Sequence, residues 1–136
     1  MQVLKMLRSF RHAIRGLGFL LEENNTKFHL LASVIVLSVG FYTKLTSIEW
    51  SIILIQIGLV IAAETFNTAI EKLCDFVSPE HQPLIGKVKD LSAAAVLIVS
   101  GVAVIVGIII FLPKLFNYSI SIAALIHQIT HSLIAP

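Results

Sequence analysis

Residues 61–72 read Ile-Ala-Ala-Glu-Thr-Phe-Asn-Thr-Ala-Ile-Glu-Lys, and this stretch decides how the rest of the chain is interpreted. It is the end of a long apolar run that begins at Trp50, yet it contains Glu64, Asn67 and Glu71. Spacings of three and four residues place these three side chains on one face of an α-helix. Carboxylates inside a membrane segment cost free energy, so their presence there indicates a functional site.

The row of Glu64, Asn67 and Glu71 could instead have a purely structural role. Asp75 extends the row by one more helical turn, and Lys87 and Lys89 follow in the next polar stretch. The acids could therefore seal helix contacts or pair with these lysines.

The composition places the chain in a membrane. Of its 136 residues, enough for one domain over 1–136, 57% are hydrophobic and only 13% are charged, with a mean hydropathy of +0.91. Such a chain is too apolar for a soluble protein of this size. The single Cys74 excludes an internal disulfide and a cysteine-based metal cluster. We expect no nucleic-acid partner.

Hydrophobic periodicity predicts an all-α membrane protein with three transmembrane helices and an N-terminal amphipathic surface helix. We expect the surface helix over residues 2–21, membrane spans over 28–43, 50–72 and 91–111, and an additional tail over 114–136.

The surface helix has one basic and one apolar face. Its apolar positions recur at spacings of four and three, and its basic residues lie largely opposite, which is typical of a helix at an anionic membrane surface. The apolar residues are Val3, Leu7, Phe10, Ile14, Leu17 and Leu21; the basic ones are Lys5, Arg8, Arg11, His12 and Arg15. Packing of this helix on a neighbouring protein helix is the alternative.

Polar segments separate the expected helices. Residues 22–25 form a hinge, 43–49 a turn and 75–90 a loop, in which Pro79 and Pro83 should not continue a helix. Pro113 is expected to end the third span.

The distribution of lysine and arginine predicts the orientation. All except Lys44 and Lys114 fall in the segment through Lys27 or in residues 72–90. The N-terminus and the second loop should therefore face the cytoplasm, in a multi-pass protein of the inner (cytoplasmic) membrane.

The tail contains His127 and His131, four residues apart on a helix. That spacing suits a metal, but no third ligand lies nearby in sequence, and an interfacial helix is the favoured interpretation.

The acid row could support two kinds of chemistry. A carboxylate in apolar surroundings can take a proton from a hydroxyl, and a second one in a wetter position suits Mg²⁺. These parts fit phosphoryl transfer to a lipid alcohol, and they fit a small proton-coupled transporter almost as well. The chain contains neither a P-loop nor a kinase glycine loop.

A longer pattern resembles a known family. The run Glu64-Thr-Phe-Asn-Thr-Ala-Ile-Glu71, then Asp75, then residues 86–95, Gly-Lys-Val-Lys-Asp-Leu-Ser-Ala-Ala-Ala, is similar to the bacterial membrane diacylglycerol kinases and their undecaprenol kinase relatives. The resemblance covers roughly residues 5–113. It implies a homotrimeric helical bundle, ATP as co-substrate, Mg²⁺ as cofactor, a lipid alcohol as acceptor and active sites at subunit contacts.

The resemblance also implies roles for individual residues. Glu64 would be the catalytic base and Asn67 its polar support, while Glu23 and Glu71 would hold the metal. The implied nucleotide contacts are Lys5, His12, Glu23, Glu71, Glu80, His81, Gln82, Lys89 and Asp90.

Two departures from the family pattern bear on these roles. Lys5 stands where arginine is usual, and lysine lacks the planar fork that binds phosphate in a bidentate way. The chain is one residue shorter than the pattern between Gly16 and Glu23, so Glu22 is an alternative metal ligand.

The acceptor lipid follows from the resemblance alone. His29 and the ending Phe111-Leu-Pro-Lys-Leu are similar to the undecaprenol-using branch. We therefore expect undecaprenol to be converted to undecaprenyl phosphate, with diacylglycerol, which would give phosphatidic acid, as the alternative acceptor.

Overall fold

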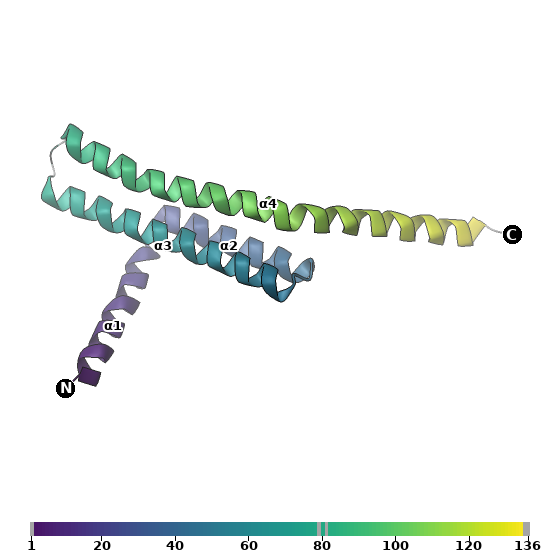
Figure 1. Cartoon of the computed structure of the whole chain (residues 1–136), viewed down its shortest axis with the longest axis horizontal. Coiled ribbons are helices and arrows are strands. Elements are labelled where there is room, and N and C mark those ends of the chain that lie inside the picture. Colours follow the sequence, from purple (N-terminus) through teal and green to yellow (C-terminus); the bar gives the residue numbers. More distant parts are fainter. Residues whose placement is uncertain (1, 79, 81, 135–136) are drawn as a thin grey trace.

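The computed structural model describes residues 2–78, 80 and 82–134, and these residues form four α-helices and no strand. In order they are α1 (Gln2–Leu20), α2 (Asn24–Tyr42), α3 (Ser47–Val77) and α4 (Pro83–Ile134). Helices α2, α3 and α4 lie side by side, while α1 leaves the bundle at the start of α2 and α4 extends far beyond its neighbours (Figure 1). The expected all-helical class is confirmed.

Two helices in the described part of the chain, α3 and α4, are long and apolar enough to cross a membrane. Helix α2 falls short because its first turns carry Asn24, Asn25, Lys27 and His29, so its apolar stretch begins only at Leu30. The third span therefore stays a prediction.

Helix α3 has a well-defined start. The Thr46 hydroxyl accepts a hydrogen bond from the Glu49 backbone N–H at 3.3 Å, and the Thr46 backbone N–H donates to the Glu49 carboxylate at 2.7 Å. This reciprocal capping satisfies two backbone donors that the first turn would leave unpaired. The helix thus begins inside the segment that we expected to be a turn over 43–49.

The turn between α2 and α3 depends on a close approach at Gly40. A Cβ at this position would lie 2.9 Å from Trp50 Cη2 and 3.0 Å from Leu45 Cδ1. The Trp50 ring also packs on Phe41, with ring centroids 4.7 Å apart. Glycine therefore lets the end of α2 touch the start of α3.

The expected loop over 75–90 is wrong in extent. Helix α3 continues to Val77 and α4 begins at Pro83, so the connection is only residues 78–82, of which 79 and 81 lie outside the described residues. Proline suits the first helical position because its missing N–H would have no intrahelical partner there.

Pro113 does not end the helix, because α4 continues through it to Ile134; the end of the membrane span near this residue stays a prediction. Proline removes one backbone hydrogen bond, but apolar surroundings offer the remaining backbone groups no partner outside a helix, so continuation is favoured. The ion pair between Lys114 and Glu49, at 3.1 Å, also holds the residue after the proline against α3. The tail is thus a direct extension of α4; its interfacial placement stays a prediction.

The buried residues of the described chain include as many polar as apolar side chains. Besides Cys74, which packs as a small hydrophobe as expected, they are Leu20, Leu45, Ile53, Val60, Thr26, Thr43, Glu64, Asn67 and Ser92. Most large apolar side chains of α4 are exposed, which suits a helix surrounded by hydrocarbon. Asn67 and Ser92 lie where α3 faces the first turns of α4, while Thr26 and Thr43 lie at the two ends of α2.

Candidate active site

Glu64 is the most deeply enclosed charged side chain of the cluster, with 3% of its surface exposed. Within the described part of the chain, no hydrogen bond or ion pair reaches its carboxylate. The titratable groups close enough to act on it electrostatically are His29, Glu71 and Glu23. The fold therefore brings the start of α2 to the acid row on α3.

Asn67 connects the row to α4. Its Nδ2 donates to Glu71 Oε1 at 3.0 Å, and its Oδ1 accepts a hydrogen bond from the Ser92 hydroxyl at 2.7 Å. Asn67 and Ser92 are both buried, at 4% and 9% exposure. An amide that is paired on both sides holds Glu71 in one orientation.

Two ion pairs surround this network. Lys89 on α4 lies 2.6 Å from Asp75, and Lys72 on α3 lies 2.7 Å from Glu23. The structural explanation of the acid row thus applies to Asp75, whereas no lysine neutralises Glu64. Lys89 is also close enough to Glu71 to interact with it electrostatically.

Three predicted nucleotide contacts lie at or near the start of α4. Asp90 and Gln82 are exposed, and so is Glu80, whose carbonyl accepts a hydrogen bond from the Ser78 hydroxyl at 3.0 Å. The predicted contact His81 lies outside the described residues. Their contact with nucleotide stays a prediction.

Lys5 and His12 are not brought to the cluster within one chain. Both are exposed on α1, which runs away from the other helices (Figure 1). Their predicted contact with nucleotide would need α1 to adopt another position or to approach a second copy.

The magnesium site expected at Glu23 and Glu71 stays a prediction. No group of three or more His, Cys, Asp or Glu side chains among the described residues could enclose a metal. However, Mg²⁺ at phosphoryl-transfer sites usually takes one or two carboxylates and completes its octahedron with phosphate oxygens and water. Glu23 lies close enough to Glu64 to act on it electrostatically, and it pairs with Lys72 at 2.7 Å. The choice between Glu23 and Glu22 as the second metal ligand stays a prediction.

Sequence reasoning assigned no role to Ser92 or Lys72. The Ser92 hydroxyl on α4 donates a hydrogen bond to Asn67 on α3, and Lys72 forms an ion pair with Glu23. A serine in the first turns of an apolar helix was a usable signal, because polar side chains in membrane helices commonly bond across to a neighbour. The Lys72 pairing had no comparable signal, since Glu23 is distant in sequence.

The tail histidines form no described site. His127 and His131 both fall in α4, but the side chain of His131 lies outside the described residues.

Comparison with known proteins finds a matching family model and several related proteins. The sequence model of the family "Prokaryotic diacylglycerol kinase" matches residues 11–111. The undecaprenol kinase of Bacillus subtilis is 41% identical over 112 residues, which cover 82% of this chain and 91% of that protein. The diacylglycerol kinase of Haemophilus influenzae is 29% identical over 78% of this chain and 92% of its own length. The diacylglycerol kinase of Escherichia coli K12 is 32% identical over 55% of this chain and 62% of its own length.

Proposed function

Because this chain belongs to the prokaryotic diacylglycerol kinase family and is a membrane lipid kinase, we propose that it transfers the γ-phosphoryl group of ATP to undecaprenol. Family membership decides between the lipid kinase and the proton-coupled transporter, which the acid row alone left open. Diacylglycerol remains the second candidate acceptor, since several relatives are diacylglycerol kinases.

The observation that carries the proposed mechanism is the enclosure of Glu64, to which no described residue donates a hydrogen bond or offers an ionic partner. Burial disfavours the charged form of a carboxylate, so the group gains by accepting a proton. In the reaction Glu64 takes the proton of the lipid hydroxyl while the hydroxyl oxygen bonds to the γ-phosphorus. The bond between that phosphorus and the bridging oxygen of ADP breaks, and ADP leaves.

The other residues of the cluster position the reactants. Asn67 and Ser92 hold Glu71, and Glu71 and Glu23 would bind magnesium, with Glu23 leaving Lys72. When bound, the ion neutralises charge on the phosphate oxygens. Lys89 would exchange its partner Asp75 for a phosphate oxygen, and Asp90, Glu80 and Gln82 would contact the nucleotide, as the family resemblance implies.

The membrane arrangement proposed with this function has three spans, α2, α3 and α4, with α1 on the cytoplasmic surface. The exposure of both faces of α1 supports a surface location, because its apolar face has no protein partner in one chain. A homotrimer would bring α1 of one copy toward the cluster of another, which would give Lys5 and His12 their expected contact.

The test is a transfer assay with purified protein. Labelled ATP, Mg²⁺ and either undecaprenol or diacylglycerol should give labelled phosphate in the organic phase, faster with undecaprenol. No organic-phase label with either lipid would contradict the proposed function, and equal rates would contradict the proposed preference.

A further inference from the structure

His29 on α2 and Glu64 on α3 lie at nearly the same level of the helix bundle. The ion pair between Glu23 and Lys72, at 2.7 Å, joins the start of α2 to α3. Measured from this pair, His29 lies about 9 Å along α2 and Glu64 about 12 Å along α3, at 1.5 Å per residue. His29 also has a larger electrostatic effect on Glu64 than Glu71 or Glu23 has.

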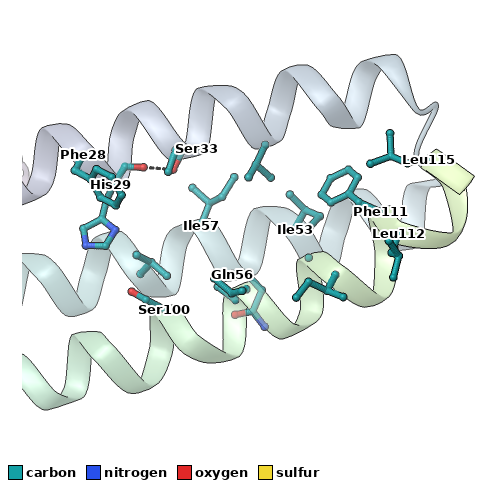
Figure 2. Close-up of a pocket in the computed structure, with 17 residues that line it drawn as sticks. Phe28, His29, Ser33, Ile53, Gln56, Ile57, Ser100, Phe111, Leu112 and Leu115 are labelled. Atoms are coloured by element: carbon teal, nitrogen blue, oxygen red, sulfur yellow. Dashed lines mark hydrogen bonds between the residues drawn. The ribbon is translucent and has the colours of Figure 1, made fainter.

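The His29 ring points from α2 into the space between α2, α3 and α4 (Figure 2). Val60, which is one helical turn from Glu64, lines the same space. Among the described residues that line it, His29 is the only one with a titratable side chain, and α4 contributes no charged group. Proton exchange with Glu64 on this side therefore depends on the imidazole.

Glu64 must lose a proton before each new turnover. In the proposed reaction its carboxylate takes the proton of the lipid hydroxyl and becomes a carboxylic acid. With only 3% of the residue exposed, this group has little direct access to water. Histidine is the side chain that ordinarily gains and loses a proton near neutral pH, so a neighbouring histidine is suited to take the proton over.

Thr26 places a further polar group on the same side of α2. It is fully buried, at 0% exposure, and its hydroxyl has no hydrogen-bond partner within the described part of the chain. Thr26 lies three residues after Glu23 and three before His29, a spacing at which side chains on a helix are neighbours. A buried unpaired hydroxyl is unfavourable, but it can both accept and donate a hydrogen bond. The Thr26 hydroxyl can therefore pass a proton from His29 toward the start of α2.

We propose that His29 restores Glu64 after each phosphoryl transfer by accepting its proton. The proton moves from the Glu64 carboxyl group to a ring nitrogen of His29, so that Glu64 becomes a carboxylate and His29 an imidazolium. The imidazolium then releases the proton through the Thr26 hydroxyl to water at the start of α2. His29 acts through Glu64 and not on the lipid itself. This inference rests on the proposed function, in which Glu64 is the base.

The experiment separates the first turnover from later ones. Purified full-length protein and its His29→Gln variant are mixed with labelled ATP, Mg²⁺ and whichever of undecaprenol and diacylglycerol the native protein phosphorylates faster. Rapid quenching then follows the labelled lipid. His29→Gln should form one labelled lipid per active site at the native rate, because Glu64 starts as a carboxylate. Later turnovers should be slower by about 100-fold, as expected for loss of a positioned proton-transfer group.

Two further variants test the route of the proton. His29→Ala leaves room for imidazole, and added imidazole should accelerate its later turnovers in proportion to concentration at low imidazole. Thr26→Val removes the hydroxyl and keeps the shape of the side chain, so its later turnovers should also be slower than native.

Ser33→Ala is the matched control on the same helix. The Ser33 hydroxyl also lies on α2, one turn beyond His29, and donates to the His29 backbone carbonyl at 2.8 Å. Because the route does not include this hydroxyl, Ser33→Ala should keep native rates in the first and later turnovers and should not respond to imidazole.

Native later turnovers in His29→Gln would overturn the proposal. So would a first turnover that is slowed as much as the later ones, since His29 would then have a structural role, or a His29→Ala variant that imidazole does not accelerate. Native later turnovers in Thr26→Val would remove its hydroxyl from the route. If the native protein itself forms no labelled lipid, the proposed function fails instead.

Discussion

Glu49 and Glu64 lie on the same helix and show two ways of holding a carboxylate in a membrane protein. Glu49 accepts hydrogen bonds from the Thr46 backbone N–H and hydroxyl, at 2.7 and 2.9 Å, and pairs with Lys114 at 3.1 Å. Glu64 is more enclosed and has no such partner within the described residues. The Glu49 carboxylate therefore stabilises the fold, whereas the Glu64 carboxylate is available to react.

The sharpest way to break this comparison is Glu64→Gln. Glutamine has nearly the same shape but cannot act as the base, so lipid phosphorylation should fall by about 100- to 10,000-fold. The melting temperature in detergent should stay the same or rise, because a buried charge is removed. Steady-state kinetics and thermal unfolding measure the two effects. Near-native turnover would remove Glu64 from the base role.

Glu71→Gln should have the next largest effect. Glutamine can still accept the hydrogen bond from Asn67, so the network keeps its geometry while one metal-binding charge is lost. The apparent affinity for Mg-ATP should fall by about tenfold or more, since even indirect partners of metal ligands cost that much when removed. A magnesium titration at fixed ATP measures the change, and an unaltered curve would exclude Glu71 from the metal site.

Ser92→Ala tests whether the Asn67 network matters for catalysis. Loss of the hydroxyl leaves the buried Asn67 Oδ1 without its partner on α4, which should cost about 1–3 kcal/mol of stability. The KM for Mg-ATP should rise in parallel if Asn67 orients Glu71. Ser92→Thr, which keeps the hydroxyl, is the matched control and should retain most activity. A stable Ser92→Ala protein with native kinetics would contradict the network's role.

Gly40→Ala tests the close packing between the end of α2 and the start of α3. Its methyl group would lie 2.9 Å from the Trp50 ring, and such overpacking should destabilise the protein by about 1–3 kcal/mol. Gly58→Ala on α3 is the control, because a Cβ there meets nothing within 4 Å and should be neutral or slightly stabilising. Thermal unfolding compares them, and equal melting temperatures would contradict the close packing at Gly40.

The smallest effect is expected for Glu49→Gln. The substitution removes the charge that pairs with Lys114 but keeps an oxygen that can accept from Thr46. We expect a slight loss of thermal stability and unchanged kinetics with saturating lipid, because partly exposed ion pairs contribute little. A large loss of turnover would mean that Glu49 belongs to the reactive class with Glu64.

Much of the fold was predictable because the signals are local. The acid row follows from spacings of three and four residues, and the apolar lengths of α3 and α4 indicate membrane helices directly. The errors occurred at proline. Pro83 was taken as part of a loop and Pro113 as a helix end, but one begins α4 and the other lies inside it. A proline suits the first position of a helix and weakens a helix interior, and in the interior its surroundings determine whether the helix continues.

The sequence allowed the acidic residues of the site to be predicted, but not which side chains they contact. Sequence by itself determined the membrane class, the helical character and the placement of Glu64, Asn67 and Glu71 on one face, because composition and helical periodicity act over a few residues. Only the tertiary structure decided that Ser92 bonds to Asn67, that Lys72 pairs with Glu23 and that no described side chain pairs with Glu64. These outcomes depend on how α2, α3 and α4 pack, and no local pattern records which side chains meet when distant helices come together.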